Sequence, residues 1–167
     1  MEYISYYHSP FGAITLASDG ASLTGLWFDT QKPSRAFLTG QYTEKDLPVF
    51  RQAKTWLSVY FGGKDPGFTP PLALQGTAFR QEVWKLLLLI PYGETVSYGE
   101  IAKKIAVQRG LSAMSAQAVG GAVGHNPVSL IVPCHRVIGK DGSLTGYGGG
   151  IPLKKQLLAL EQQGRSL

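Results

Sequence analysis

The residues of this chain best suited to chemistry surround its single cysteine, Cys134. Pro133 precedes the cysteine, and His135 and Arg136 follow it directly. A lone cysteine is most often a small buried hydrophobic residue. Positive groups nearby, however, lower the pKa of a thiol and raise the fraction present as nucleophilic thiolate. The segment therefore predicts a reactive thiolate at Cys134, with a buried, inert cysteine as the alternative.

The position of His135 in the sequence limits how it can act on the thiol. Neighbouring side chains on an extended strand point to opposite faces, so the His135 ring cannot reach Cys134 directly there. Either the chain turns at this point or a water molecule relays the proton. A base that acts in this way needs an acid to orient it. Glu161 is the candidate, because it lies one turn after Leu157 and Leu158, on the side of the last helix that should face inward. The alternative for Glu161 is a solvated residue at a helix end.

Most of the elements expected to position these residues are helices in the second part of the chain, residues 77–167. Thr77, Ser97 and Ser115 can each cap a first turn, and apolar residues follow each of them at helical spacing. The last helix is expected over residues 152–163. Asn126 can tie together a turn that ends the third of these helices. An apolar strand is expected from there to Pro133.

The helices expected at 97–105 and 116–124 could form a helix-turn-helix, a common DNA-binding unit, although their connection is longer than the usual tight turn. The second helix is almost wholly Ala, Gly and Val. Each glycine weakens a helix by roughly 1 kcal/mol, so the three glycines here should have a structural or functional reason that offsets this cost. One explanation is close approach to an outside surface such as the DNA minor groove. The other is tight packing against a helix of the same protein.

The first part of the chain, residues 1–76, predicts a small α/β unit. Residues 13–17 and 23–28 are expected to be antiparallel strands joined by a turn at Ser18-Asp19-Gly20. A helix is expected over residues 48–61, because apolar residues recur there at helical spacing. Residues 62–76 are rich in Gly and Pro and are expected to be a linker.

Composition sets broader limits. The chain has 167 residues, of which 44% are hydrophobic, so it can bury a core without disulfides or metals. Sixteen Lys and Arg oppose eleven Asp and Glu, and this excess is compatible with nucleic acid as a partner. One cysteine excludes an intramolecular disulfide and a zinc site built from several cysteines. The sequence shows neither a secretion signal at its start nor an apolar run long enough to span a bilayer, which predicts a cytoplasmic protein without membrane contact.

The run Pro133-Cys134-His135-Arg136-Val137 strongly resembles the active-site motif of the O6-alkylguanine-DNA alkyltransferases, or methylated-DNA–protein-cysteine methyltransferases. The resemblance covers essentially all of residues 77–163. Further matching segments are Phe79 to Trp84, Pro91-Tyr92-Gly93, Val96-Ser97-Tyr98, Ala118-Val119-Gly120, Asn126-Pro127, Gly146-Tyr147-Gly148-Gly149 and Leu157-Leu158-x-x-Glu161. The implied fold is a ribonuclease-H-like α/β domain over 1–76, followed by a mainly α domain with a helix-turn-helix over 77–167.

The resemblance implies repair of DNA by direct reversal of damage. Cys134 is expected to take the alkyl group from O6-methylguanine, and from O4-methylthymine, as a stable thioether, so each molecule reacts once. His135 is expected to act through water as the base, with Glu161 orienting it and Asn126 fixing the turn before the active site. Arg136 is expected to be structural. No cofactor or metal is implied, because the lesion itself is the methyl donor.

The resemblance also implies contacts with a base flipped out of double-stranded DNA. Tyr98 is expected to push on the target phosphate and hydrogen-bond the base, Tyr147 to line the pocket, and Val137 and Gly148 to meet the guanine through backbone groups. A monomer is expected to bind the minor groove largely without reading sequence. The residues expected at the DNA are Ser97, Gln117, Ala118, Gly120 and Gly121.

Two departures from the family pattern concern the DNA contact. Gln117 stands where many members carry an Arg that fills the gap left by the flipped base, so slower flipping or a different wedge is expected. The connection between the two helices is longer, around residues 107–114, and Arg109 is expected to help contact the DNA backbone there.

Three other functions fit the sequence less well. Alkyltransferase-like proteins that only bind lesions lack the cysteine that is present here. A cysteine hydrolase would need its Cys and His on separate segments and an oxyanion hole, whereas Cys134 and His135 are adjacent. A helix-turn-helix transcription factor would need a recognition helix richer in polar side chains and usually a dimer interface.

Overall fold

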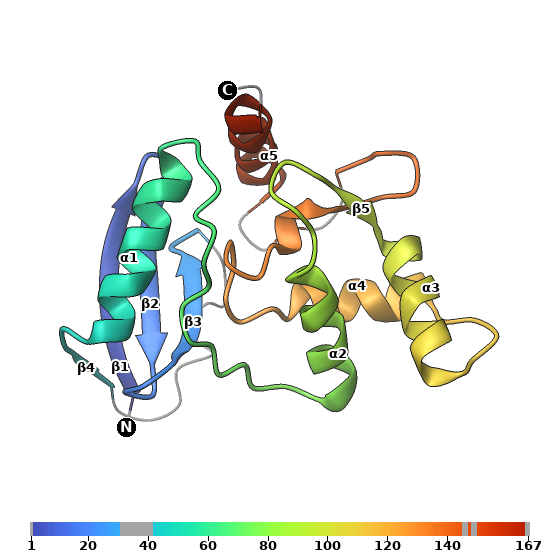
Figure 1. Cartoon of the computed structure of the whole chain (residues 1–167), viewed down its shortest axis with the longest axis horizontal. Coiled ribbons are helices and arrows are strands. Elements are labelled where there is room, and N and C mark those ends of the chain that lie inside the picture. Colours follow the sequence, from blue (N-terminus) through green and yellow to red (C-terminus); the bar gives the residue numbers. More distant parts are fainter. Residues whose placement is uncertain (1, 31–41, 145–146, 148–149, 166–167) are drawn as a thin grey trace.

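The structure is a computed structural model that describes residues 2–30, 42–144, 147 and 150–165. Figure 1 shows a sheet with one helix packed on it at one side of the molecule and a group of helices at the other. The C-terminal helix lies between these two parts in this view. No helix within the described ranges has the length and apolar character needed to cross a membrane.

The N-terminal sheet has four strands in the order β3-β2-β1-β4. β2 (Gly12–Ser18) and β3 (Leu23–Phe28) form the antiparallel pair expected from the sequence. β1 (Glu2–Ser9) pairs antiparallel with β2 and was not predicted, because its buried and exposed residues do not alternate regularly. The short edge strand β4 (Tyr42–Glu44) runs parallel to β1, so the sheet is mixed where only antiparallel strands were expected.

Helix α1 (Pro48–Phe61) covers one face of this sheet (Figure 1). Its bounds are those predicted, and Pro48 occupies the first turn, where a missing N–H does no harm. Gly63 follows the helix with a φ of 83°, a left-handed conformation that glycine adopts without strain. The apolar residues of the predicted stripe are all buried against the core, namely Val49, Phe50, Ala53, Trp56, Leu57 and Tyr60.

The second part of the chain contains the predicted helices and two very short strands. Each expected capping side chain accepts a backbone N–H of the first turn: Thr77 from Arg80, Ser97 from Glu100 and Ser115 from Ala118. The elements are α2 (Ala78–Leu87), β5 (Val96–Ser97), α3 (Tyr98–Arg109), α4 (Ala116–Gly124), β6 (Val137–Ile138) and α5 (Ile151–Arg165). α3 and α4 pack against each other, and residues 110–115 connect them.

The prediction of a strand before Pro133 is wrong. Val128 makes one isolated bridge to Leu26 of β3, and the chain then turns. Leu130 has a φ of 70°, which is uncommon for a side chain of its size. Cys134–Arg136 form a single 3₁₀ turn. The apolar residues of this segment are buried as expected, but their burial comes from packing in the core and not from a sheet.

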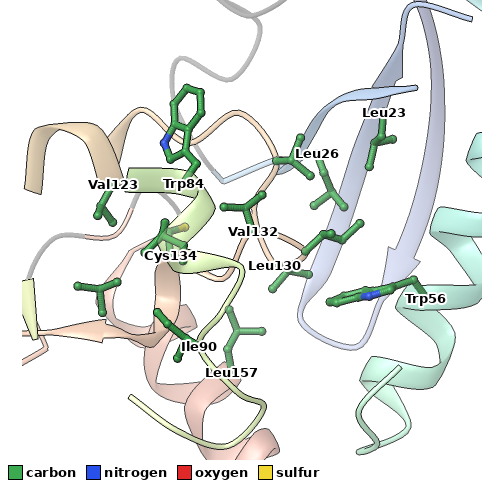
Figure 2. Close-up of a cluster of buried hydrophobic side chains, with 14 of the residues drawn as sticks. Leu23, Leu26, Trp56, Trp84, Ile90, Val123, Leu130, Val132, Cys134 and Leu157 are labelled. Atoms are coloured by element: carbon green, nitrogen blue, oxygen red, sulfur yellow. The ribbon is translucent and has the colours of Figure 1, made fainter. Parts of the chain in front are cut away.

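The two parts of the chain share one continuous core. The outer edge of β3 bonds to the segment before the active site, since Leu26 N donates to Pro127 O at 2.9 Å and Ser129 N donates to Leu26 O at 2.9 Å. Side chains of α1 and β3 join those of α2, α4 and α5 in a single buried cluster. Figure 2 shows Leu26 and Trp56 in this cluster together with Cys134. The N-terminal sheet therefore supports the segment that carries the cysteine.

Candidate active site

Cys134 lies at the start of the 3₁₀ turn with 7% of its surface exposed. Burial raises the pKa of its thiol, while a hydrogen bond from the Asn126 side chain and the charge of Lys154 act in the opposite direction. The expectation that His135 and Arg136 lower this pKa is therefore wrong. Both side chains are turned to Glu161 instead. The cation that favours the thiolate is Lys154.

Lys154 is a functional candidate that the sequence reasoning missed. Its side chain is fully buried, and its Nζ donates to the carbonyl oxygen of Val137 at 2.6 Å. Burial lowers the pKa of Lys154, and the nearby Cys134 partly counteracts this. The signal was available in the sequence, because Lys154 lies three residues before Leu157 and therefore on the inward side of the last helix.

His135 is completely buried and pairs through Nε2 with the carboxylate of Glu161. Burial lowers the pKa of His135 and outweighs the raising effect of Glu161. The other ring nitrogen, Nδ1, is buried and has no hydrogen-bond partner among the described residues. The ring therefore has one nitrogen held by an acid and one left for proton transfer, as an oriented base requires.

Glu161 is 1% exposed, so the alternative of a solvated helix-end residue is wrong. Four donors surround its carboxylate: the Tyr60 hydroxyl at 2.7 Å, His135 Nε2, Arg136 Nε at 2.8 Å and Gly93 N at 3.0 Å. Burial by itself would raise the pKa of Glu161, but its bonds and charge interactions with His135 and Arg136 bring the pKa down to about 2. Glu161 is thus a permanently charged acceptor at neutral pH.

Arg136 and Asn126 hold backbone segments in place. Arg136 bonds Glu161 and also donates from Nη1 to the carbonyl of Ile90 at 2.7 Å, which agrees with a structural role. Asn126 donates from Nδ2 to Val132 O at 2.8 Å and accepts from Val128 N at 3.0 Å. Its amide therefore closes the turn that leads to the cysteine, as the sequence predicts.

The structure describes three of the residues expected to contact a flipped base: Tyr98, Val137 and Tyr147. Val137 is fully buried, and its carbonyl already accepts from Lys154. Tyr147 is half-buried, and burial together with the neighbouring Cys134 raises its pKa well above the ordinary value. Tyr98 is half-buried at the start of α3 and faces Gly120 of α4. Gly148 lies outside the described residues.

The surroundings of the glycines in α4 distinguish between the two explanations for them, close approach to an outside surface and tight packing inside the protein. The buried side of α4 is formed by Val119, Ala122 and Val123. The exposed side carries Gln117, Ala118, Gly121 and Gly124. A Cβ added at Gly121 or Gly124 would have no heavy atom within 4 Å, and one at Gly120 would meet only Tyr98 in ordinary contact at 3.8 Å. Packing inside the protein therefore does not require these glycines, and the external-surface explanation remains.

The expected DNA contact by Arg109 finds no support in this structure. Arg109 forms an ion pair with Glu82 of α2 at 2.8 Å, and its guanidinium lies over the ring of Phe79. These contacts attach the end of α3 to α2. Ser97, also expected near DNA, is half-buried and is engaged as the cap of α3.

Comparison with known proteins adds family evidence to this geometry. Residues 78–163 match the family model described as 6-O-methylguanine DNA methyltransferase, DNA binding domain, and residues 3–74 match that of its ribonuclease-like domain. A methylated-DNA–protein-cysteine methyltransferase of Mycobacterium tuberculosis is 51% identical over 156 residues, which cover 92% of this chain and 88% of the relative. A protein of the same name from Haemophilus influenzae is 43% identical over 161 residues, which cover 96% of this chain and 86% of the relative.

Solved structures agree with this assignment. Mycobacterium tuberculosis OGT in complex with DNA superposes with a TM-score of 0.83 at 46% identity, covering 97% of this chain and 94% of that one. An O6-methylguanine DNA methyltransferase from Methanococcus jannaschii gives a TM-score of 0.64 at 27% identity, covering 95% of this chain and 93% of that one. Sequence identity, family models and fold thus coincide over nearly the whole length, and the chain belongs to the 6-O-methylguanine DNA methyltransferase family.

Proposed function

We propose that this protein repairs DNA by moving the methyl group of O6-methylguanine, and of O4-methylthymine, onto Cys134. The observation that carries the proposal is the placement of the single cysteine beside a buried lysine and in the same 3₁₀ turn as His135, whose ring pairs with the buried Glu161 of α5. A relative that is 51% identical to this chain is named a methylated-DNA–protein-cysteine methyltransferase. The protein acts as a monomer in the cytoplasm, where a single thiol stays reduced.

The reaction begins with the proton of the thiol. Nδ1 of His135 accepts this proton through a water molecule, and Glu161 stabilises the imidazolium that results. The buried ammonium of Lys154 favours the thiolate left on Cys134. The sulfur then attacks the methyl carbon, so that the S–C bond forms as the C–O6 bond breaks. The electron pair of that bond stays on the guanine, which regains a proton held by His135.

The product explains why each molecule reacts once. A methyl thioether has no easily broken bond to sulfur, so nothing in the proposed site restores the thiol. The methyl group comes from the lesion, and the reaction needs no cofactor. A cysteine hydrolase would instead release its acyl group to water and turn over repeatedly.

DNA is expected to meet the exposed face of α4. Its glycines leave the helix backbone uncovered by side chains, so the helix can come close to a narrow minor groove. Such binding depends on the width of the groove and on contacts with the DNA backbone. Tyr98 stands beside this face, at the start of α3, and is proposed to press on the phosphate of the flipped nucleotide. Gln117 is proposed to fill the gap in the duplex, less firmly than the longer, charged Arg would.

Gly121→Ala tests the role of the bare helix face. The added methyl group meets no atom of the protein within 4 Å. Alanine is the better helix former, so we expect the free energy of unfolding to rise by about 1 kcal/mol. The same methyl group should hinder close approach to DNA and weaken duplex binding several-fold.

Urea unfolding and fluorescence anisotropy with a labelled duplex measure these two effects. The control is Ala21→Gly in the exposed turn between β2 and β3, which should leave DNA affinity unchanged. Unchanged affinity in Gly121→Ala would remove α4 from the proposed interface.

Intact mass after mixing with a duplex that carries one O6-methylguanine tests the function itself. We expect a gain of one methyl group per protein, located by peptide mapping at Cys134, and no gain with the same duplex carrying guanine. Tight lesion binding without a mass change would identify a lesion sensor. Repeated turnover without a stable adduct would identify a hydrolase.

A further inference from the structure

The catalytic pair is completed by a side chain from the other half of the protein. Tyr60 lies in the last turn of α1, on the N-terminal sheet, and is fully buried. Its hydroxyl donates to Oε2 of Glu161 at 2.7 Å and lies 3.4 Å from Nε2 of His135. Oε2 is also the oxygen that pairs with His135. One carboxylate oxygen is thus shared by the phenol and the imidazole.

The ring of Tyr60 is held on several sides, so its hydroxyl has little freedom to leave this position. It stacks on Trp56 with ring centres 5.1 Å apart and an interplanar angle of 10°. Phe61 and Tyr92 contact the ring edge-on, with centres at 5.3 and 6.1 Å. Burial, reinforced by the charge of Glu161, raises the pKa of Tyr60 well above its ordinary value. The hydroxyl therefore remains a protonated donor throughout the working pH range.

We propose that Tyr60 is a positioning residue of the methyl-transfer reaction, which sets the orientation and basicity of His135 through the shared oxygen of Glu161. This inference rests on the proposed roles of His135 and Glu161. It assigns to the N-terminal part a direct contribution to the chemistry, in addition to its support of the fold.

The sign of the effect follows from electrostatics. A donor to a carboxylate withdraws part of its negative charge, and less charge then remains to stabilise a neighbouring imidazolium. When the phenol is removed, Oε2 keeps His135 as its donor and attracts the protonated ring more strongly. The pKa of His135 should therefore rise. The neutral ring that accepts the thiol proton becomes scarcer as the pH falls, so the acid limb of the rate profile should move to higher pH.

Tyr60→Phe removes only the hydroxyl and keeps the ring packing. We expect the His135 pKa, followed by NMR of ¹⁵N-labelled imidazole, to rise by about half a unit, roughly a threefold change in proton affinity. The acid limb of single-turnover methyl transfer should shift by the same amount. Tyr7→Phe is the matched control. Tyr7 lies on β1, and its hydroxyl bonds Ser58 of α1 and not the His135–Glu161 pair.

A second substitution reverses the expected sign. Ring-fluorinated tyrosine at position 60 is a stronger donor of the same shape, and it should lower the His135 pKa. A purely structural role of Tyr60 would instead change stability with no shift in either titration, and that result would overturn the inference. The NMR titration needs no methyl transfer, so it tests the coupling of Tyr60 to His135 even if the wild-type protein fails to take up a methyl group.

Discussion

Cys134→Ser is expected to abolish methyl transfer, by about three orders of magnitude or more in rate, while the protein still folds. Serine keeps the shape of the side chain but replaces a thiol, which ionises readily, with an alcohol that barely ionises near neutral pH. The hydroxyl is buried, which costs about 1–3 kcal/mol unless it is hydrogen-bonded. Asn126 and Ser129 already act on the thiol and can partner it.

The measurement combines intact mass, thermal unfolding and binding to the lesion duplex. We expect no mass gain, a melting temperature lower by a few degrees, and lesion binding that persists. A variant that still acquired a stable methyl group would contradict the assignment of Cys134 as acceptor. Loss of lesion binding together with transfer would show instead that the substitution had disrupted the pocket.

Glu161→Gln is expected to damage both stability and chemistry. The glutamine keeps the volume but removes the charge that His135 and Arg136 face, and it turns one acceptor into a donor aimed at other donors. Removing one partner of a buried ion pair typically destabilises a protein by about 3–5 kcal/mol. Without the carboxylate the His135 imidazolium loses its stabiliser, so we expect the transfer rate to fall by roughly 10²-fold or more.

The pH dependence of stability provides an independent test of Glu161. The pKa of Glu161 in the folded protein is about 2, below its ordinary value of 4.5. A depressed pKa means that the carboxylate stabilises the fold above pH 4.5 and that this stabilisation is lost as the pH falls towards 2. The shift corresponds to about 3 kcal/mol. The pKa of His135 is also lowered in the folded protein. Protonation of its ring therefore also reduces stability as the pH falls, and this loss begins at a higher pH than that of Glu161.

Urea unfolding of wild type and Glu161→Gln at a series of pH values separates these contributions. We expect the two stability curves to converge as the pH falls from about 5 to about 2, because the variant has no carboxylate to protonate. Parallel curves over that interval would show that Glu161 has no depressed pKa. Glu44→Gln on the exposed edge strand β4 is the matched control and should follow the wild type.

Local signals in the sequence predicted much of this architecture. Helix α1 has its predicted bounds because proline and a pair of glycines delimit a regular apolar stripe. The three capping side chains of α2, α3 and α4 act as expected because capping depends only on residues three positions apart. Glu161 could be proposed as a buried acid because its spacing from Leu157 places it on the inward face of α5.

What the sequence did not predict depends on contacts between distant segments. The run before Cys134 is apolar like a strand, yet β3 offers it a single bridge at Leu26, so it turns instead. Tyr60 belongs to a regular apolar stripe, and nothing local indicates that its hydroxyl meets a carboxylate 101 residues away. The direction of the Cys134 pKa shift differs from the prediction for the same reason. His135 and Arg136 are near in sequence but face Glu161, and the relevant charge comes from Lys154.

Because the lone thiol is buried, chemical labelling of Cys134 can measure how often the protein opens around it. A bulky thiol reagent can react only with molecules that have transiently opened around Cys134, which is 7% exposed. With a single cysteine in the chain, every labelling event reports the same opening, and no background from other sites needs subtraction. If the protein closes again faster than the reagent reacts, the ratio of the labelling rate of Cys134 to that of a free thiol gives the free energy of that opening directly. Labelling at different temperatures would then distinguish a local movement of the turn from unfolding of the shared core.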